Sequence, residues 1–305
     1  MLLAAACGSP YSDDPPIAAA RFRYSGHETG PSTVGVIPDA VLNQDITLNV
    51  DYPTRGGPHP LIVFSPASGL SHRDYVGLSS YWAANNYVVL RLGGSGAEQM
   101  RAVLDSLDAL EQRYPELQGK IDRTRIAVAG HAEGARAAME LASDPRIKAV
   151  VAMEPPAEPE VRLPALFIAA APPPQQPAAT ATEGPPPVPL PEAFTRAPAG
   201  DKWAIVIRGA RPQTFTGRLD DVTWVQARAR APQGDPFDQP PPVATTTDGR
   251  YISRADLAAM RQQDLFAVVR GAALAFLDTY MRNEAEAREA LTKVTDRRGV
   301  TLERK

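Results

Sequence analysis

The sequence has few of the residues that cross-link or anchor a protein. Its 305 residues include one cysteine, so no intrachain disulfide can form, and we expect no zinc site made of cysteine and histidine. No apolar run reaches the length of about eighteen residues that a transmembrane helix needs. Lysine and arginine are dispersed and are not interleaved with aromatic residues, which argues against a nucleic-acid partner. We expect no metal and no organic cofactor.

The residues that are present are typical of a globular protein. Hydrophobic residues make up 44% of the chain and charged residues 22%, and the net charge is −3. A chain of this length can bury a large core, so we expect one main domain.

The N-terminal stretch "MLLAAACGSP" resembles the end of a bacterial lipoprotein signal, in which small residues precede a cysteine that receives lipid. It lacks a positively charged segment, and its apolar part is shorter than that of a complete signal peptide. Two interpretations stay open. Either Cys7 anchors an exported protein to the bacterial envelope through lipid, with residues 1–29 as a tether, or the chain has an unstructured Ala-rich start.

Short apolar runs alternate with helical patterns along the chain. The runs, each typical of a buried parallel strand, cover residues 61–64, 87–90, 126–129, 149–153, 165–168 and 203–207. Helical spacing is clearest in two stripes, the first made of Met100, Val103, Leu104, Leu107 and Leu110 and the second of Leu265, Val269, Ala272, Phe276 and Tyr280. This alternation predicts an α/β fold, with a mostly parallel central sheet and helices on both faces.

The expected domain covers residues 30–293 and is interrupted by two proline-rich stretches. Residues 171–192 and 231–250 have the composition of extended surface loops. Residues 294–305 are expected to form a C-terminal tail.

The stretch "RIAVAGHAEGARAAME" has the pattern of a strand, a tight turn and a helix. This arrangement is typical of a nucleophile elbow, G-x-S-x-G, but the central residue here is Ala132. The glycines of the motif, Gly130 and Gly134, are expected where strand and helix pass too closely for side chains. If the elbow is retained, Ala132 has a positive φ at the end of a central strand, and Glu133 begins the helix.

Several motifs in the same chain order extend this likeness, among them "GGPHPLIVFSPASGLSHRDY", "GKIDRTRIAVAGHAEGA", "GDKWAIVIRGARPQTFTG" and "LAFLDTYMRNEAEAREAL". Together they resemble bacterial α/β-hydrolases of the dienelactone-hydrolase-like and platelet-activating-factor-acetylhydrolase-like kind. The resemblance implies an α/β-hydrolase fold, ester hydrolysis, and a catalytic Ser, Asp and His in that chain order.

The resemblance also locates these three catalytic positions, and the chain has replaced them. The nucleophile position is Ala132, which has no lone pair with which to attack a carbonyl. The histidine position, in "GARPQTF", is Pro212, and the turn expected to hold the acid reads "AAAPPPQQ". Glu154 is the only plausible residual acid. All four histidines of the chain precede the elbow centre, namely His27, His59, His72 and His131.

The oxyanion hole that the resemblance implies consists of backbone groups, which a side-chain replacement leaves in place. Its donors are the N–H groups of Ser68 and Glu133, which could bind a carbonyl or carboxylate oxygen. We expect His131 to be structural and His72 to be solvated.

Three functions remain open from the sequence. The first is a pseudoenzyme that binds a small molecule or a protein. The second is a serine ester hydrolase whose nucleophile was replaced by Ala132, and the third is a hydrolase that uses other residues such as Glu133 or Glu154. Replacement of one serine would leave the base and the acid intact, whereas Pro212 and the acid turn also differ. The sequence therefore favours the first function.

Overall fold

The computed structural model describes most of the region expected to be the domain. The described residues are 24, 26, 34–42, 46–171, 188–217, 244–245, 251–252, 254–296 and 299–305. Cys7, His27 and nearly all of the two proline-rich stretches lie outside them.

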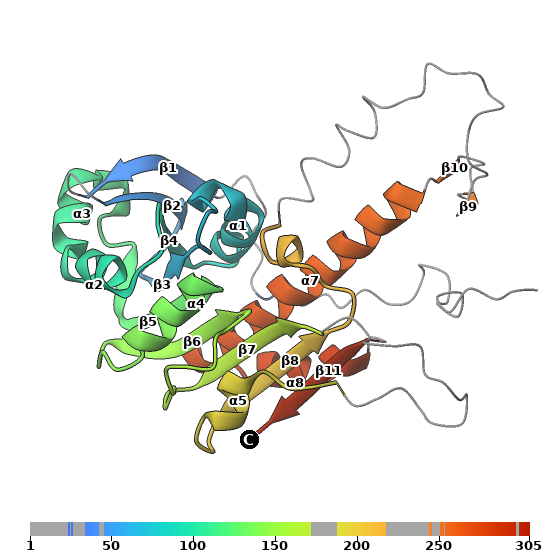
Figure 1. Cartoon of the computed structure of the whole chain (residues 1–305). Coiled ribbons are helices and arrows are strands. Elements are labelled where there is room, and N and C mark those ends of the chain that lie inside the picture. Colours follow the sequence, from blue (N-terminus) through green and yellow to red (C-terminus); the bar gives the residue numbers. More distant parts are fainter. Residues whose placement is uncertain are drawn as a thin grey trace, which may run out of the picture.

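A nine-stranded sheet forms the centre of the fold, in the order β1-β2-β4-β3-β5-β6-β7-β8-β11 (Figure 1). Six neighbouring strands, from β4 to β8 in that order, are parallel, and β1, β2 and β11 complete the two sides with antiparallel pairings. The strands are β1 Val34–Val41, β2 Thr47–Pro53, β3 His59–Ser65, β4 Val88–Leu92, β5 Ile121–His131, β6 Ile147–Met153, β7 Ala165–Ala170, β8 Lys202–Ile207 and β11 Val300–Arg304. The predicted α/β class and the mostly parallel sheet are confirmed.

Helices cover both faces of this sheet. They are α1 Val76–Ala84, α2 Ala97–Asp105, α3 Leu107–Arg113, α4 Glu133–Leu141, α5 Glu192–Arg196, α7 Arg254–Met281 and α8 Ala285–Thr292. Short 3-10 turns are η2 His72–Tyr75, η3 Pro115–Leu117, η4 Pro212–Phe215 and η5 Lys293–Asp296, and β9 Ala244–Thr245 pairs with β10 Tyr251–Ile252 as a separate ribbon.

Alternation along the strands divides the buried side chains into two cores. In β3, Leu61 and Val63 face the core under α2, α3 and α4, whereas Ile62 and Phe64 face the core under α1, α7 and α8. The first predicted helical stripe is buried as expected, but the helix is interrupted at Ser106, so the stripe is shared between α2 and α3. The second stripe lies along α7.

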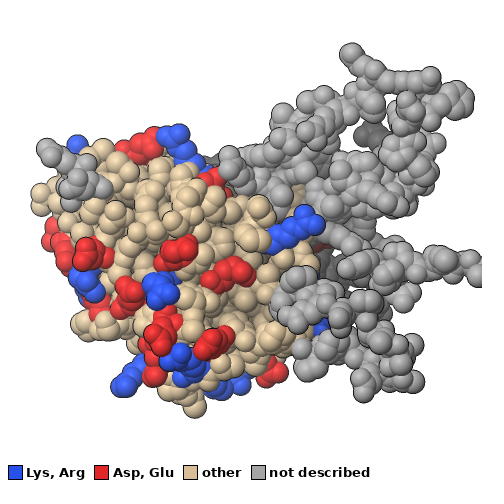
Figure 2. All heavy atoms as spheres, in the orientation of Figure 1, with Lys and Arg blue, Asp and Glu red and all other residues tan. Residues whose placement is uncertain are grey.

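The C-terminal residues are part of the sheet rather than a tail. Strand β11, within residues 294–305, pairs antiparallel with β8 along its whole length. The pattern "VTLER" begins with alternating apolar and polar residues but is short, and the free edge of β8 supplies its hydrogen-bond partners. On the face of the molecule that Figure 2 shows, acidic and basic side chains are interspersed, as their dispersal along the sequence predicts.

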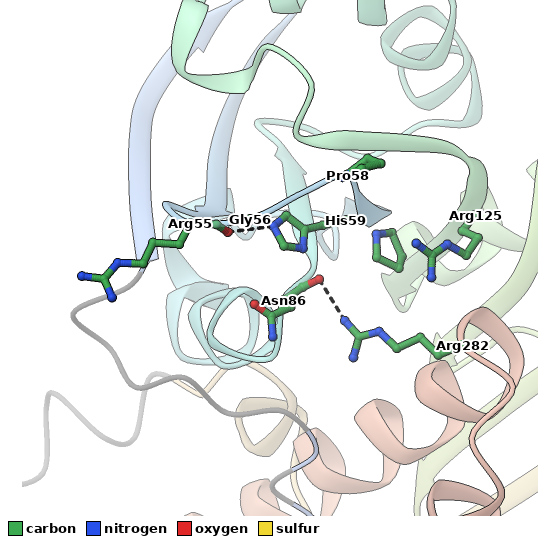
Figure 3. Close-up of a pocket in the computed structure, with 8 residues that line it drawn as sticks. Arg55, Gly56, Pro58, His59, Asn86, Arg125 and Arg282 are labelled. Carbon is green, nitrogen blue, oxygen red and sulfur yellow. Dashed lines mark hydrogen bonds between the residues drawn. The ribbon is translucent and has the colours of Figure 1, made fainter.

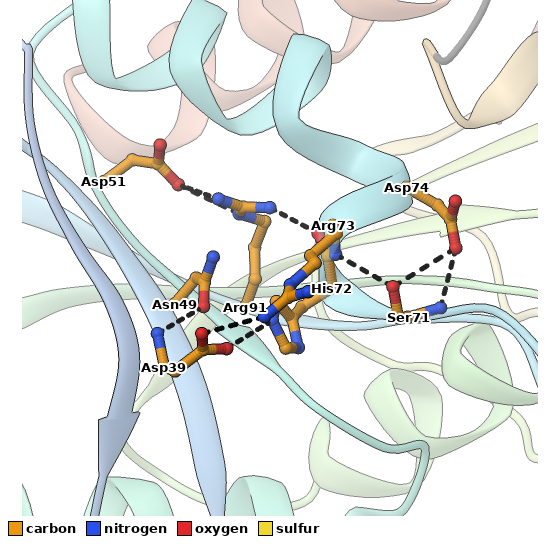
Figure 4. A network of polar contacts seen from close by, with 8 residues as sticks. All are labelled: Asp39, Asn49, Asp51, Ser71, His72, Arg73, Asp74 and Arg91. Carbon is orange, nitrogen blue, oxygen red and sulfur yellow. Dashed lines mark hydrogen bonds and ion pairs between the residues drawn. The ribbon is translucent and has the colours of Figure 1, made fainter.

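A buried ion pair joins β2 to β4. The Arg91 guanidinium lies 2.8 Å from Asp51 Oδ2, and each side chain is 1% exposed. Arg91 also donates to the His72 carbonyl, and this bond ties η2 to the sheet (Figure 4).

His72 is buried, so the expectation that it is solvated is wrong. The Ser71 hydroxyl and the Asp74 carboxylate cap η2 reciprocally, and the resulting turn directs the imidazole inward, where Nε2 lies 3.3 Å from Asp39 Oδ1 (Figure 4). Burial lowers the pKa of His72, and the positive charge of Arg91 lowers it further, against the opposing effect of Asp39. His72 is therefore a neutral core side chain at neutral pH.

Asp51→Asn is expected to lower the free energy of unfolding by about 3–5 kcal/mol, because it leaves the buried Arg91 charge without its counter-charge. Urea denaturation measures this loss. The matched control is Asp108→Asn, which breaks the ion pair between Asp108 and Arg123. The Asp108 side chain is 77% exposed, so this variant should lose less than about 1 kcal/mol of unfolding free energy. Equal losses in the two variants would contradict the argument.

Candidate functional site

The turn between β5 and α4 has the backbone of a nucleophile elbow. Ala132 follows the last residue of β5, the middle strand of the nine, and has φ 51° and ψ −111°. Glu133 begins α4, and the Ala132 N–H donates to the Met153 carbonyl of β6 at 2.8 Å. Both conformational expectations, the positive φ and the helix start at Glu133, are confirmed.

Two glycines allow this turn to form. A Cβ atom on Gly130 would collide with the backbone of Gly134, and a Cβ atom on Gly134 would collide with the carbonyls of Ser65 and Pro66. The first turn of α4 therefore lies directly against the ends of β5 and β3. The close approach expected from the motif is present at both positions.

One of the two backbone donors predicted for the oxyanion hole binds a carboxylate of the chain itself. The Ser68 N–H donates to Glu133 Oε2 at 3.1 Å. This hydrogen bond is the largest cause that lowers the pKa of Glu133, and the backbone N–H of Glu133 is the second. The two predicted donor residues are thus brought together by the Glu133 carboxylate.

Sequence reasoning missed this role of the Glu133 side chain. An acidic residue at the first position of a helix is a usable signal, because the free N–H groups and the helix dipole favour negative charge there. The contact with Ser68 has no comparable signal, since the two residues are 65 positions apart.

His131 is buried beside the elbow and belongs to a hydrogen-bond chain. The Ala67 N–H donates to the Tyr75 hydroxyl at 3.1 Å, and that hydroxyl lies 2.8 Å from His131 Nδ1. His131 Nδ1 is therefore engaged by Tyr75, whichever of the two groups donates. Burial lowers the pKa of His131 to about 4, against the opposing effect of Glu133. These contacts support the structural role expected for His131.

Pro212 lies in a segment that packs next to the elbow. It is the first residue of η4, and the Phe215 ring at the other end of η4 lies 5.3 Å from the His131 ring, centroid to centroid. The position that the resemblance assigns to the catalytic histidine is therefore near the elbow, but the proline side chain has no atom that accepts a proton.

Glu154 follows β6, the strand next to β5, and its contacts are with the backbone of β7. Oε1 accepts a hydrogen bond from the Ala170 N–H at 2.5 Å, and the Glu154 N–H donates to the Ile168 carbonyl at 2.8 Å. Burial raises the pKa of Glu154, partly offset by the Ala170 bond. Glu154 is bound to β7 by these contacts, and no described histidine is recorded as its partner.

The described part of the chain has neither a metal-binding cluster nor a membrane-spanning helix. Within it, no group of three or more His, Cys, Asp and Glu side chains is placed to hold a metal ion. Among the described helices, none combines the length and the apolar character that crossing a membrane requires. Cys7, the expected lipid-attachment residue, lies outside the described residues.

The low pKa of His131 predicts a loss of stability in mild acid. Between its usual pKa of 6.5 and the folded value of about 4, the unfolded chain binds a proton that the folded protein does not, so stability falls as pH decreases. In His131→Gln the amide oxygen can still accept from Tyr75, but nothing titrates. From about pH 7 to about pH 5, the parent should lose about 2 kcal/mol more than this variant in urea denaturation. Identical losses would contradict the buried neutral imidazole, since His59 and His72 contribute equally to both proteins.

Ala132→Gly should leave the melting temperature unchanged or raise it, because glycine adopts this φ and ψ without the strain of about 1–3 kcal/mol that a Cβ atom brings. Ala102→Gly, within α2, is the control and should cost about 0.5–1 kcal/mol, the usual penalty for glycine in a helix. A similar drop in both variants would show that the elbow stores no strain.

Comparison with known proteins adds no family to this geometry. No protein-family model matches the chain, and no curated protein matches it.

Proposed function

We propose that this chain is a pseudoenzyme: an α/β-hydrolase-fold protein without catalytic activity that binds a small molecule or a protein. The mostly parallel sheet and the elbow after its middle strand support the fold assignment. Motifs in the same chain order support it independently.

The observation that carries the proposal is Ala132 at the elbow centre. The backbone keeps the strained conformation that serves to display a nucleophile, but the side chain is a methyl group. A methyl group neither attacks a carbonyl nor donates a proton. The costly geometry without the nucleophile is what distinguishes this site from an ordinary turn.

The neighbours of Ala132 agree with the absence of catalysis. Pro212 offers no base, and His131, the histidine beside the elbow, has its Nδ1 engaged by Tyr75. The Glu133 carboxylate accepts from the Ser68 N–H, one of the two donors that would stabilise a developing oxyanion. A substrate carbonyl would have to displace a carboxylate that carries a full negative charge at neutral pH.

These contacts also limit where a ligand binds. An oxygen atom that used the Ser68 and Glu133 N–H groups would compete with an anion tethered to the same site. A ligand or partner at this edge of the sheet is therefore expected to contact the Glu133 carboxylate itself or to move it aside.

Hydrolysis of p-nitrophenyl acetate and butyrate tests the proposal, with heat-denatured protein as the blank. We expect no turnover above that blank from the parent. The assay must resolve slow rates, because enzymes that lose their triad keep a residual acceleration on the order of a thousand-fold over water.

Three variants make this test specific. Ala132→Ser should also be inactive, because its hydroxyl has no base, and Ala132→Ser combined with Glu133→Gln should remain inactive although its donors face no charged carboxylate. Activity restored by Ala132→Ser would show that only the nucleophile is missing. Saturable hydrolysis by the parent that disappears in Glu154→Ala would instead identify a hydrolase with different catalytic residues. Melting curves confirm that each variant is folded.

A further inference from the structure

A pocket of about 470 Å³ lies at the opposite edge of the sheet from the elbow. His59, in its lining, is the first residue of β3, and Asn86 precedes β4, so the pocket is at the amino-terminal ends of these parallel strands. Ala132 follows the carboxyl end of β5. The pocket is therefore separate from the elbow around Ala132, and the inference drawn from the pocket does not rest on the proposed function.

Three of the eight lining residues are arginines. Arg55, Arg125 and Arg282 all contribute to the lining, and Figure 3 shows the guanidinium groups of Arg125 and Arg282 directed toward the same space, with His59 and Asn86 beside them. The Arg55 side chain extends away from this space in the same view.

Arg282 is held rigidly before any ligand arrives. Its guanidinium lies 2.7 Å from Asp278 Oδ1, donates to the carbonyls of Asn85 and Asn86 at 2.8 and 2.9 Å, and stacks 4.3 Å above the centre of the Tyr87 ring. The side chain is 11% exposed. Little conformational entropy remains to be lost when an anion binds to it.

Arg125 has unused donors on the other side of the pocket. Its Nε donates to Asp122 Oδ2 at 2.6 Å, and within the described residues its two terminal nitrogens have no recorded acceptor. The side chain is 37% exposed. Two terminal guanidinium nitrogens without a recorded acceptor suit an oxyanion that accepts two parallel hydrogen bonds.

His59 lies among these cationic groups. Its Nε2 lies 3.0 Å from the Arg55 carbonyl and donates to it. Burial lowers the pKa of His59 and the Arg55 bond raises it, while the positive charges of Lys120, Arg282 and Arg125 lower it further. The nearby carboxylates, Asp122 and Asp278, are each already bound to one of the arginines.

We propose that this pocket binds a phosphate group, either as inorganic phosphate or as the phosphate of a small phosphorylated molecule. The unused terminal nitrogens of Arg125, beside the fixed Arg282 guanidinium, suit the oxygens of a phosphate group, and Lys120, which donates to the Gly56 carbonyl of the lining, adds a positive charge. The volume is within the range of small-molecule sites, so it leaves room for an organic group attached to the phosphate.

Calorimetric titration of the full chain with inorganic phosphate and with glycerol 3-phosphate tests this site, at constant ionic strength and with chloride as the reference anion. Arg125→Gln should weaken binding about tenfold or more. Arg162→Gln is the matched control, because its side chain is 90% exposed on another part of the surface, and it should bind as the parent does. Arg282 is left intact because its bonds to Asn85 and Asn86 also support the fold. Tighter binding of glycerol 3-phosphate identifies a phosphate ester as the ligand class, and equal binding identifies free phosphate.

Histidine ring signals in an NMR pH titration give a second measurement. Bound phosphate should offset the positive charges and raise the pKa of His59, whereas the His131 signal at the opposite edge should not move. Absence of saturable binding, equal weakening in Arg162→Gln, or an unchanged His59 pKa at saturating phosphate would each overturn the proposal. None of these outcomes bears on ester hydrolysis, so failure here and failure of the pseudoenzyme proposal are distinguishable.

Discussion

The candidate site depends on how closely the first turn of α4 approaches the ends of β3 and β5. Gly130 and Gly134 are required there because a Cβ atom at either position would meet backbone atoms. This contact forces the chain through a tight reversal and places Ala132 at a positive φ. It also brings Glu133 to the loop after β3, where its carboxylate accepts the Ser68 N–H. The energetic cost of the reversal is met by packing across the sheet, as is usual for strained backbone in a functional site.

Polar contacts hold the loop after β3, which carries Ser68, in place. Arg91, neutralised by Asp51 in the core, binds the His72 carbonyl and so fixes the start of η2. At the end of η2, the Tyr75 hydroxyl joins the Ala67 N–H to His131. The loop that carries Ser68 is thus tied to β4 and to the elbow. The groups that do this are a compensated ion pair and a neutral imidazole, so the net charge beside the elbow comes from Glu133.

The carboxyl-terminal and amino-terminal ends of the parallel strands carry different charged groups. At the carboxyl edge, the Glu133 carboxylate accepts from the Ser68 N–H, so the chain supplies its own anion. At the amino edge, Arg125 and Arg282 line one pocket, and each is paired with an aspartate. The first arrangement opposes an incoming anion, whereas we propose that the terminal nitrogens of Arg125, which have no recorded acceptor within the described residues, bind one. A binding protein without catalytic chemistry can use either property, because recognition requires complementary charge and not a reactive group.

The sequence alone determined the parts of this protein that depend on neighbouring residues. Apolar runs predicted the six parallel strands, because periodicity acts over a few positions. Likeness of the segment around Ala132 to the G-x-S-x-G motif predicted the elbow and, if it is retained, the positive φ of Ala132. Ala132 and Pro212, at the positions that the resemblance assigns to a nucleophile and a histidine, can likewise be read from the sequence. Tertiary structure alone decided that His72 is buried, that β11 completes the sheet, that the Glu133 carboxylate reaches Ser68, and that Arg125 and Arg282 face one pocket. These contacts join residues far apart in the chain, and their partners are set by how the crossovers bring the strand ends together, which no local pattern encodes.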